Sequence, residues 1–321
     1  MKNPQTISKM AKGRYDPLFA RFLLSQTRFQ AYGAWIRINE FLRRLIIMHV
    51  NSDRDMAACL YPIHSYQMDE EVNFGFPSKP YSDFVSFYHQ IRIGRNNRSL
   101  TIYPTGTTTV VCRLNNHEPD SFLVGTPTFA REAEYAVSGG DYFAAFLWPA
   151  IGYCLFPNPP NEIINRHIPI DEIFSGAARR LAERMALAKT FQQRIYLFER
   201  FLSEILIDSR QIPLQHKRLI QSICQVSATP LDHGAAKIRH AEFTNRHIRR
   251  LSIKYLGISP NLLSRIVRYQ KSLHFLKAYP EDCMAGLAIE QGYFDQSHFI
   301  KEFKRFQGVT PRELIRRFSR Q

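Results

Sequence analysis

The chain has 321 residues, enough for two domains, and its 45% hydrophobic residues are sufficient for ordinary folded cores. This composition excludes a wholly disordered chain and indicates a soluble globular protein. The formal net charge of +15 predicts a polyanionic partner or an acidic membrane surface.

The excess charge is unevenly distributed along the chain. From residue 211 to the end there are 19 Lys and Arg against 8 Asp and Glu, a net charge of +11, which leaves +4 for residues 1–210. A separate basic domain is the simplest explanation. The five cysteines form no CxxC pair and no zinc-type spacing with histidine, so we expect reduced thiols in a cytoplasmic protein. They are Cys59, Cys112, Cys154, Cys224 and Cys283.

Residues 1–75 are predicted to form a helical N-terminal extension with no assigned role. The first residues are basic but lack the apolar segment and cleavage site of a signal peptide. Within residues 16–50 apolar side chains recur at helical spacing, with the arginines largely off that stripe. A basic amphipathic helix could touch a membrane, but we favour a helix docked on the protein's own core and expect no membrane partner. The stripe contains Trp35, Ile38, Phe41, Leu42, Leu45 and Ile46.

Residues 76–210 are predicted to form a β-rich domain that ends in helices. From about residue 91 to residue 148 short β-branched and aromatic runs alternate with Gly, Pro, Asn and Asp, which predicts a mostly antiparallel sheet or small barrel. The runs are SLTIYPTG, TTTVVCRL, SFLVGTP, EAEYAV and YFAAFLW. Aromatic residues here are expected in the core rather than around a ligand pocket. They include Tyr103, Phe146, Trp148 and Tyr153.

The apolar stretch YFAAFLWPAIGYCLFP ends this region. With 16 residues and a central Pro149 it is short for a membrane-spanning helix, and we expect buried strands joined by a turn. Helical periodicity returns from about residue 169 to residue 208. The segment DSRQIPLQ, residues 208–215, breaks the helix with a proline where the charge also changes, so we place a domain boundary there and a second domain over 211–321.

The basic region contains an internal repeat. RHIRRLSIKYLGISPNLL and SHFIKEFKRFQGVTPREL align without a gap at an offset of 51 residues, which pairs His247 with His298 and Gly257 with Gly308. We call residues around 246–263 the first copy and residues around 297–314 the second copy. In each copy a helix is predicted to end at a glycine, and Ser or Thr then caps a helix that has proline at its first position.

A second short helix is predicted upstream of each copy. In the second copy MAGLAIEQ precedes a turn through Gly292, and Asp295 is expected to cap the next helix. In the first copy GAAKIRHAEF precedes Thr244, the expected cap. Helix, short turn and helix form a helix-turn-helix, so the spacing predicts two of them joined by a linker helix over SPNLLSRIVRYQKSLHFLKAY.

These residues resemble the AraC/XylS-type transcriptional regulators from about residue 214 to residue 318, and GYFDQSHFIKEFKRFQGVTP is similar to that family's C-terminal signature. The resemblance implies a seven-helix DNA-binding domain whose two recognition helices enter successive major grooves of double-stranded DNA. Residues 76–175 resemble, more weakly, the N-terminal domain of a subset of the family, through YPTGTTTVVCRL, LVGTP, FLWPAIGYCLF and PIDEIF. This implies an α+β protein, an activator that contacts RNA polymerase, with an N-terminal domain that senses a small-molecule effector or forms a homodimer.

The first copy departs from this pattern. It has no glycine between its two helices, and Ser252 occupies the position of Phe303 in the second copy, which is normally apolar. The inward face of this helix then has only three apolar residues, Ile248, Leu251 and Tyr255. We therefore expect the helix to pack less firmly than its counterpart in the second copy.

The exposed faces of the two recognition helices are the candidate site. Phe299, Phe303 and Phe306 share one helix face and are expected in the core, so the remaining face is free for polar contacts. Residues near the start of a recognition helix contact bases, and those farther along contact phosphates. The predicted base contacts are Gln296, Ser297, His298 and Lys301, with Asn245, Arg246, Arg249 and Arg250 in the first copy. The predicted phosphate contacts are Lys304, Arg305 and Lys254.

Three alternatives compete with this interpretation. The charges could form an ordinary solvated face, but the duplicated architecture and the local charge of +11 favour DNA. A DNA alkyl-transfer repair enzyme would need a reactive cysteine, for which Cys112 is the candidate, yet its apolar strand setting favours an inert thiol. A nucleoid protein would bind DNA of any sequence. We find no nucleotide-binding, HExxH or GxSxG motif and expect no enzyme activity, cofactor or metal site.

Overall fold

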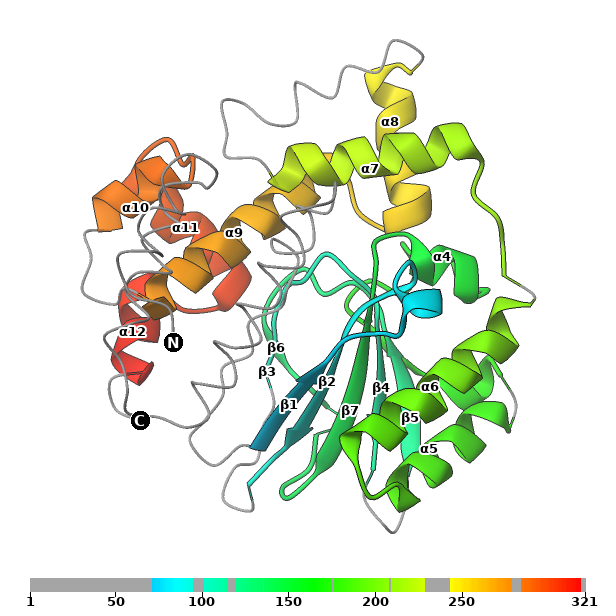
Figure 1. The fold of residues 1–321 in the computed structure, drawn as a ribbon. Helices are drawn as coiled ribbons and strands as arrows, with labels where there is room; N and C mark the ends of the chain where they lie inside the picture. The colour runs from blue at the N-terminus through cyan, green and yellow to red at the C-terminus, as the bar shows by residue number, and fades with distance from the viewer. Residues whose placement is uncertain are drawn as a thin grey trace, which may run out of the picture.

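The computed structural model describes residues 71–94, 101–114, 119–134, 136–174, 176–207, 209–228, 243–278 and 284–318. A β-sheet covered by two helices comes first, and a group of helices follows (Figure 1). We call residues 71–207 the sheet unit and residues 209–318 the helical unit. This order confirms the predicted α+β fold class. The helix predicted within residues 16–50 lies outside the described residues.

The sheet unit is built on a six-stranded sheet in the order β1-β2-β7-β4-β5-β8, in which all neighbours are antiparallel. Strand β7 is central, since its Ala145 is paired with Tyr88 of β2 on one side and Val110 of β4 on the other. Strands β3 and β6 form a separate two-stranded sheet. The strands are β1 (Glu71–Gly75), β2 (Val85–Arg92), β3 (Thr101–Ile102), β4 (Thr109–Arg113), β5 (Asp120–Val124), β6 (Arg131–Glu132), β7 (Asp141–Leu147) and β8 (His167–Pro169).

Both faces of the large sheet are buried. Successive side chains of a strand point to opposite faces, so Phe143 of β7 belongs to one core and Phe146 to another. Two helices, α5 (Ala177–Leu187) and α6 (Phe191–Leu206), cover the Phe143 face (Figure 1). Helix α6 begins where the Thr190 side chain accepts a hydrogen bond from the Gln193 amide and the Gln193 side chain accepts one from the Thr190 amide.

Several expectations for the sheet unit need correction. The predicted strands began near residue 91, so β1 and nearly all of β2 were missed. Among the described residues of EAEYAV, only Glu132 lies in a strand. The second half of YFAAFLWPAIGYCLFP is helix α4 (Ile151–Leu155) rather than a strand, because Ala150 takes a left-handed conformation with φ 71° and turns the chain after Pro149.

The helical unit is arranged around the long helix α9. Helices α7 and α8 lie toward the beginning of α9 and the remaining three lie toward its end (Figure 1). Helix α9 is the predicted linker helix, and its Leu263, Ile266, Leu273 and Leu276 are buried in the shared core. The helices are α7 (Leu214–Ala228), α8 (Asn245–Leu256), α9 (Pro260–Ala278), α10 (Met284–Glu290), α11 (Gln296–Gln307) and α12 (Pro311–Phe318). The helix predicted over GAAKIRHAEF lies outside the described residues except for its last residue, Phe243.

None of the helices in the described ranges combines the length and the hydropathy that a bilayer crossing requires.

Candidate nucleic-acid interface

Helix α11 of the second copy is fixed at both ends and along one side. The Asp295 carboxylate accepts a hydrogen bond from the His298 amide at 2.7 Å and caps its start. Gly308, with φ 81°, ends it in the left-handed conformation that glycine adopts without strain. Phe299, Phe303 and Phe306 are at most 1% exposed, as expected. The helix therefore presents one defined face outward.

The outward face of α11 carries the predicted polar and cationic residues. Gln296 and Ser297 are exposed in its first turn, followed by Lys301, Lys304 and Arg305. Positive side chains at the end of a helix are favoured by its dipole, and long cations can reach a phosphate backbone. The structure brings these five residues onto the same exposed surface.

His298 differs from the other predicted base contacts, because its ring is bound within the turn. Its Nδ1 accepts a hydrogen bond from the Phe294 amide at 3.3 Å, and its ring packs edge-on against Tyr293 at 5.5 Å. The neutral ring then carries its proton on Nε2, which lies 3.7 Å from Glu302 Oε2. The main structural role of His298 is therefore to hold the turn. Its side chain is nevertheless 45% exposed.

Glu302 is a residue of α11 that the sequence analysis missed. Its side chain is 6% exposed and its Oε2 accepts a hydrogen bond from Arg265 Nε of α9 at 2.7 Å. The Arg265 guanidinium also lies 5.4 Å from the centre of the Phe306 ring. A second hydrogen bond between the two helices runs from the Tyr269 hydroxyl of α9 to the Gln307 side chain of α11. The only sequence signal was an acidic residue between Phe299 and Phe303 of the buried stripe.

Helix α8 of the first copy has the same construction. Thr244 accepts a hydrogen bond from the His247 amide at 3.3 Å and caps its start, and Gly257, with φ 80°, ends it. Its inward residues are buried as predicted: Ile248, Leu251 and Tyr255.

Ser252 corrects the expectation of weak packing in the first copy. Its side chain is fully buried, and its hydroxyl donates a hydrogen bond to the Ile258 carbonyl oxygen at 2.6 Å. A buried hydroxyl that is paired in this way avoids the cost of an unsatisfied polar group. The serine therefore ties α8 to the chain that follows it.

The outward face of α8 also carries the predicted polar and cationic side chains. Asn245, Arg246, Arg249 and Arg250 are exposed, and Arg250 lies within 3.3 Å of His247 Nε2. Lys254 is exposed too, but its ammonium group lies 5.2 Å from the Tyr255 ring centre and 5.7 Å from that of Tyr153 in the sheet unit. This predicted phosphate contact is therefore held next to the sheet unit.

The sheet unit touches the helical unit at several points. Tyr153 of α4 packs edge-on against Tyr255 of α8 with ring centres 4.8 Å apart, and the Arg210 guanidinium lies 4.3 Å from the Tyr153 ring centre. The Ala130 amide donates a hydrogen bond to the Phe306 carbonyl oxygen of α11 at 2.6 Å. Both α8 and α11 are thus in contact with the sheet unit.

The aromatic residues considered for a pocket do not line one cavity together. Phe146 lines a small recess of about 40 Å³ against the sheet. Trp148 donates its Nε1–H to the Ser82 carbonyl oxygen at 2.8 Å, Tyr103 belongs to the core of the helical unit, and Tyr153 packs on α8. Three of the four therefore contribute to packing or to the contact between the units.

Cys112 does not have the properties of a reactive nucleophile. Its thiol is fully buried in β4, and burial raises its pKa to about 12. The thiolate form that a nucleophile requires is therefore scarce at neutral pH. Among the described residues no cluster of His, Cys, Asp and Glu could hold a metal ion.

Comparison with known proteins finds a matching domain within the helical unit. Residues 238–317 match the family described as "Helix-turn-helix domain". An uncharacterized HTH-type transcriptional regulator of Haemophilus influenzae is 26% identical over 128 residues, which are 39% of this chain. The match spans 43% of that relative's length.

Solved structures of ToxT from Vibrio cholerae are similar to the chain, with low sequence identity and low TM-scores. The O395 structure has 15% identity and a TM-score of 0.36, and covers 78% of this chain and 98% of its own. A structure of unsaturated fatty acid bound ToxT from strain SCE256 has 14% identity and a TM-score of 0.34, and covers 79% of this chain and 97% of its own. The assignment rests on the domain match and on the two capped helices: residues 238–317 carry a helix-turn-helix domain.

Proposed function

We propose that this protein is a sequence-specific DNA-binding transcription regulator that reads two adjacent major grooves with α8 and α11. The observation that carries the proposal is the repeat of one design 51 residues apart. Each helix has a side-chain cap, a left-handed glycine end, a buried apolar side and an exposed cationic side. A cationic face on a fixed helix suits the major groove, where side chains meet base edges and phosphates.

Further details of the proposal follow from the domain assignment and the resemblance to AraC-type regulators. We infer two domains divided near residue 211, of which the second binds double-stranded DNA in the cytoplasm. Activation through RNA polymerase is proposed rather than repression, and homodimerisation and a small-molecule effector are proposed for the first domain. No enzymatic step is included, because the candidate nucleophile Cys112 is buried with a raised pKa.

Control by the sheet unit is proposed from its contact with α8. Tyr153 lies against Tyr255 and beside the ammonium group of Lys254, so a movement of the sheet unit would change the surroundings of a proposed phosphate contact. Tyr153→Ala is expected to change the affinity for specific DNA, whereas Tyr196→Ala, at an exposed position of α6, leaves it unchanged. Equal affinities for both variants would contradict control through this contact.

The experiment that tests the proposed function starts with selection of bound sites from random DNA by the full chain. The selected site is then competed against scrambled DNA at one fixed salt concentration, because salt dominates affinity for nucleic acid. A regulator is expected to prefer the selected site by at least about 1,000-fold. A ratio near one would contradict the proposal and favour the nucleoid alternative.

A further inference from the structure

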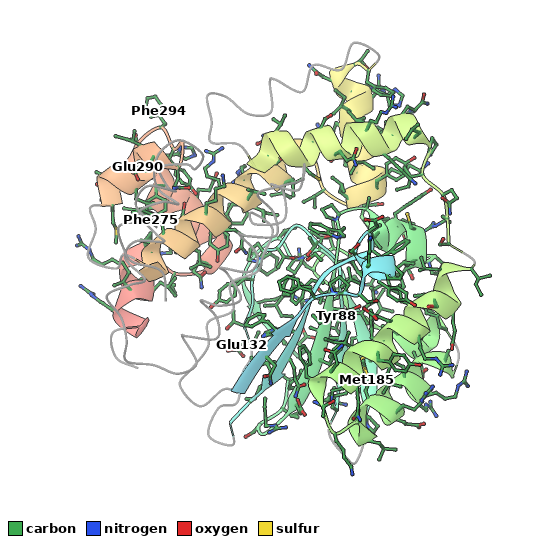
Figure 2. All side chains as sticks on the ribbon, in the orientation of Figure 1. Tyr88, Glu132, Met185, Phe275, Glu290 and Phe294 are labelled. Atoms are coloured by element: carbon green, nitrogen blue, oxygen red, sulfur yellow. The ribbon has the colours of Figure 1, made fainter. Side chains whose placement is uncertain are left out.

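Phe294 is the most exposed large apolar side chain in the described part of the chain. It is 90% exposed and directly precedes Asp295, the cap of α11. Figure 2 shows its side chain projecting outward from the turn between α10 and α11. The turn itself is fixed, because the Phe294 amide donates to His298 Nδ1 and Asp295 accepts from the His298 amide. An aromatic ring is thus held in water on an ordered backbone.

The internal repeat shows that this exposure is not required by the fold. At the offset of 51 residues the counterpart of Phe294 is Phe243, which also precedes a helix cap. Phe243 is packed against the core of the helical unit, and its ring contacts His247 edge-on at 5.0 Å. In the second copy Tyr293 takes the corresponding place against His298. Phe294 is therefore an additional aromatic residue that the second copy leaves outside its core.

Phe294 lies next to the first turn of α11, so the surface that would cover its ring is the DNA bound by that turn. Gln296 and Ser297 follow within three residues and are exposed in the first turn of α11, the part of a recognition helix that meets base edges. The only apolar group that a base pair presents in the major groove is the C5-methyl group of thymine, and phenylalanine is one of the side chains that contact it. The cationic residues of α11 bring phosphates, rather than another apolar surface, toward this side.

We propose that Phe294 determines specificity by packing against a thymine methyl group at the edge of the site read by α11. The inference rests on the proposed function, since it assigns one further contact to the same interface. It predicts an invariant thymine in the selected site, next to the bases that Gln296 reads. The contact is lost when the methyl group is removed from the DNA, even with the protein unchanged.

The test replaces each thymine of the selected site, one at a time, with deoxyuridine, which lacks only the methyl group. One replacement is expected to weaken binding of the natural chain by about fourfold, the effect of one buried methyl-sized group. Phe294→Ala should weaken binding to the thymine site and show no further loss with deoxyuridine at that position. Tyr196→Ala, which removes an exposed aromatic ring from α6, should keep the full methyl dependence.

The outcomes separate this inference from the proposed function. If the selected site is bound specifically but no deoxyuridine weakens binding, or Phe294→Ala shows the same dependence as the natural chain, the inference is overturned and the proposed function remains. In that case the exposed Phe294 ring would be assigned to a contact with another protein instead of DNA. If no DNA is preferred over scrambled sequence, both fail.

Discussion

Arg265 of α9 donates a hydrogen bond from Nε to Oε2 of Glu302 in α11 at 2.7 Å, and the Glu302 side chain is only 6% exposed. This pair joins α9 to α11. It also neutralises a carboxylate that lies one residue from Lys301, where a free negative charge would repel DNA phosphates. The orientation and the charge of the proposed reading face therefore depend on the same contact.

Arg265→Ala is expected to lower the free energy of unfolding by roughly 2–4 kcal/mol, because it leaves the buried Glu302 carboxylate without its partner. Urea unfolding of the full chain measures the difference. Arg312→Ala, which removes an exposed arginine from α12, is the matched control and should stay within about 0.5 kcal/mol of the natural chain. Equal stabilities of the two variants would show that the pair contributes nothing.

Ser252→Ala tests the first copy. The change removes the hydrogen bond to the Ile258 carbonyl oxygen inside the core and should cost about 1–2 kcal/mol of unfolding free energy. Ser222→Ala, which removes a half-buried hydroxyl of α7 and its hydrogen bond to the Arg218 carbonyl oxygen of the same helix, should cost at most about 0.5 kcal/mol. A variant at Ser252 as stable as the natural chain would mean that the bond does not fix α8.

A pH dependence is expected from His216 of α7, whose Nδ1 lies 2.8 Å from the Tyr255 hydroxyl. Burial lowers the pKa of His216, and the nearby charges of His247, Lys254 and Arg250 lower it further. As the pH falls through about 6.5, His216 therefore takes up a proton more readily in the unfolded chain than in the folded chain. Its contribution to the free energy of unfolding is complete above that pH and is lost below it. Between pH 7.5 and pH 5.5 the melting temperature of His216→Gln should fall less than that of the natural chain. If the melting temperatures of both proteins fall by the same amount over this pH range, His216 does not cause the pH dependence.

Gln296→Ala and Lys304→Ala separate base contacts from phosphate contacts. The first is expected to relax the preference at one base pair and cost ~1–3 kcal/mol of binding to the selected site. The second should weaken binding to all sequences alike and reduce the salt slope by about one. Titrations at several salt concentrations distinguish the two. A uniform loss in both variants would contradict the assignment of α11.

The features that could be predicted from the sequence are local ones. The caps at Thr244 and Asp295 and the glycine ends at Gly257 and Gly308 depend on a few neighbouring residues, and the structure confirms all four. The exposed faces of α8 and α11 followed from helical periodicity in the same way.

The features that could not be predicted depend on contacts between distant segments. Helix α4 has five residues in an apolar run that suits a strand equally well, and the left-handed turn at Ala150 that starts it has no signal in the sequence. The partner of Glu302 is 37 residues away, so the pair follows only from how α9 and α11 lie together. The engagement of His298 depends on the ring of Tyr293 and the backbone of Phe294 in the preceding turn.

A hydroxyl-radical footprint of the full chain on its selected site tests the central claim most directly. Two engaged recognition helices should protect two segments on one face of the DNA, about 34 Å or one helical turn apart. Arg249→Ala in α8 should weaken one segment and Lys301→Ala in α11 the other. Protection confined to a single groove, or loss of both segments together in each variant, would contradict reading by two helices.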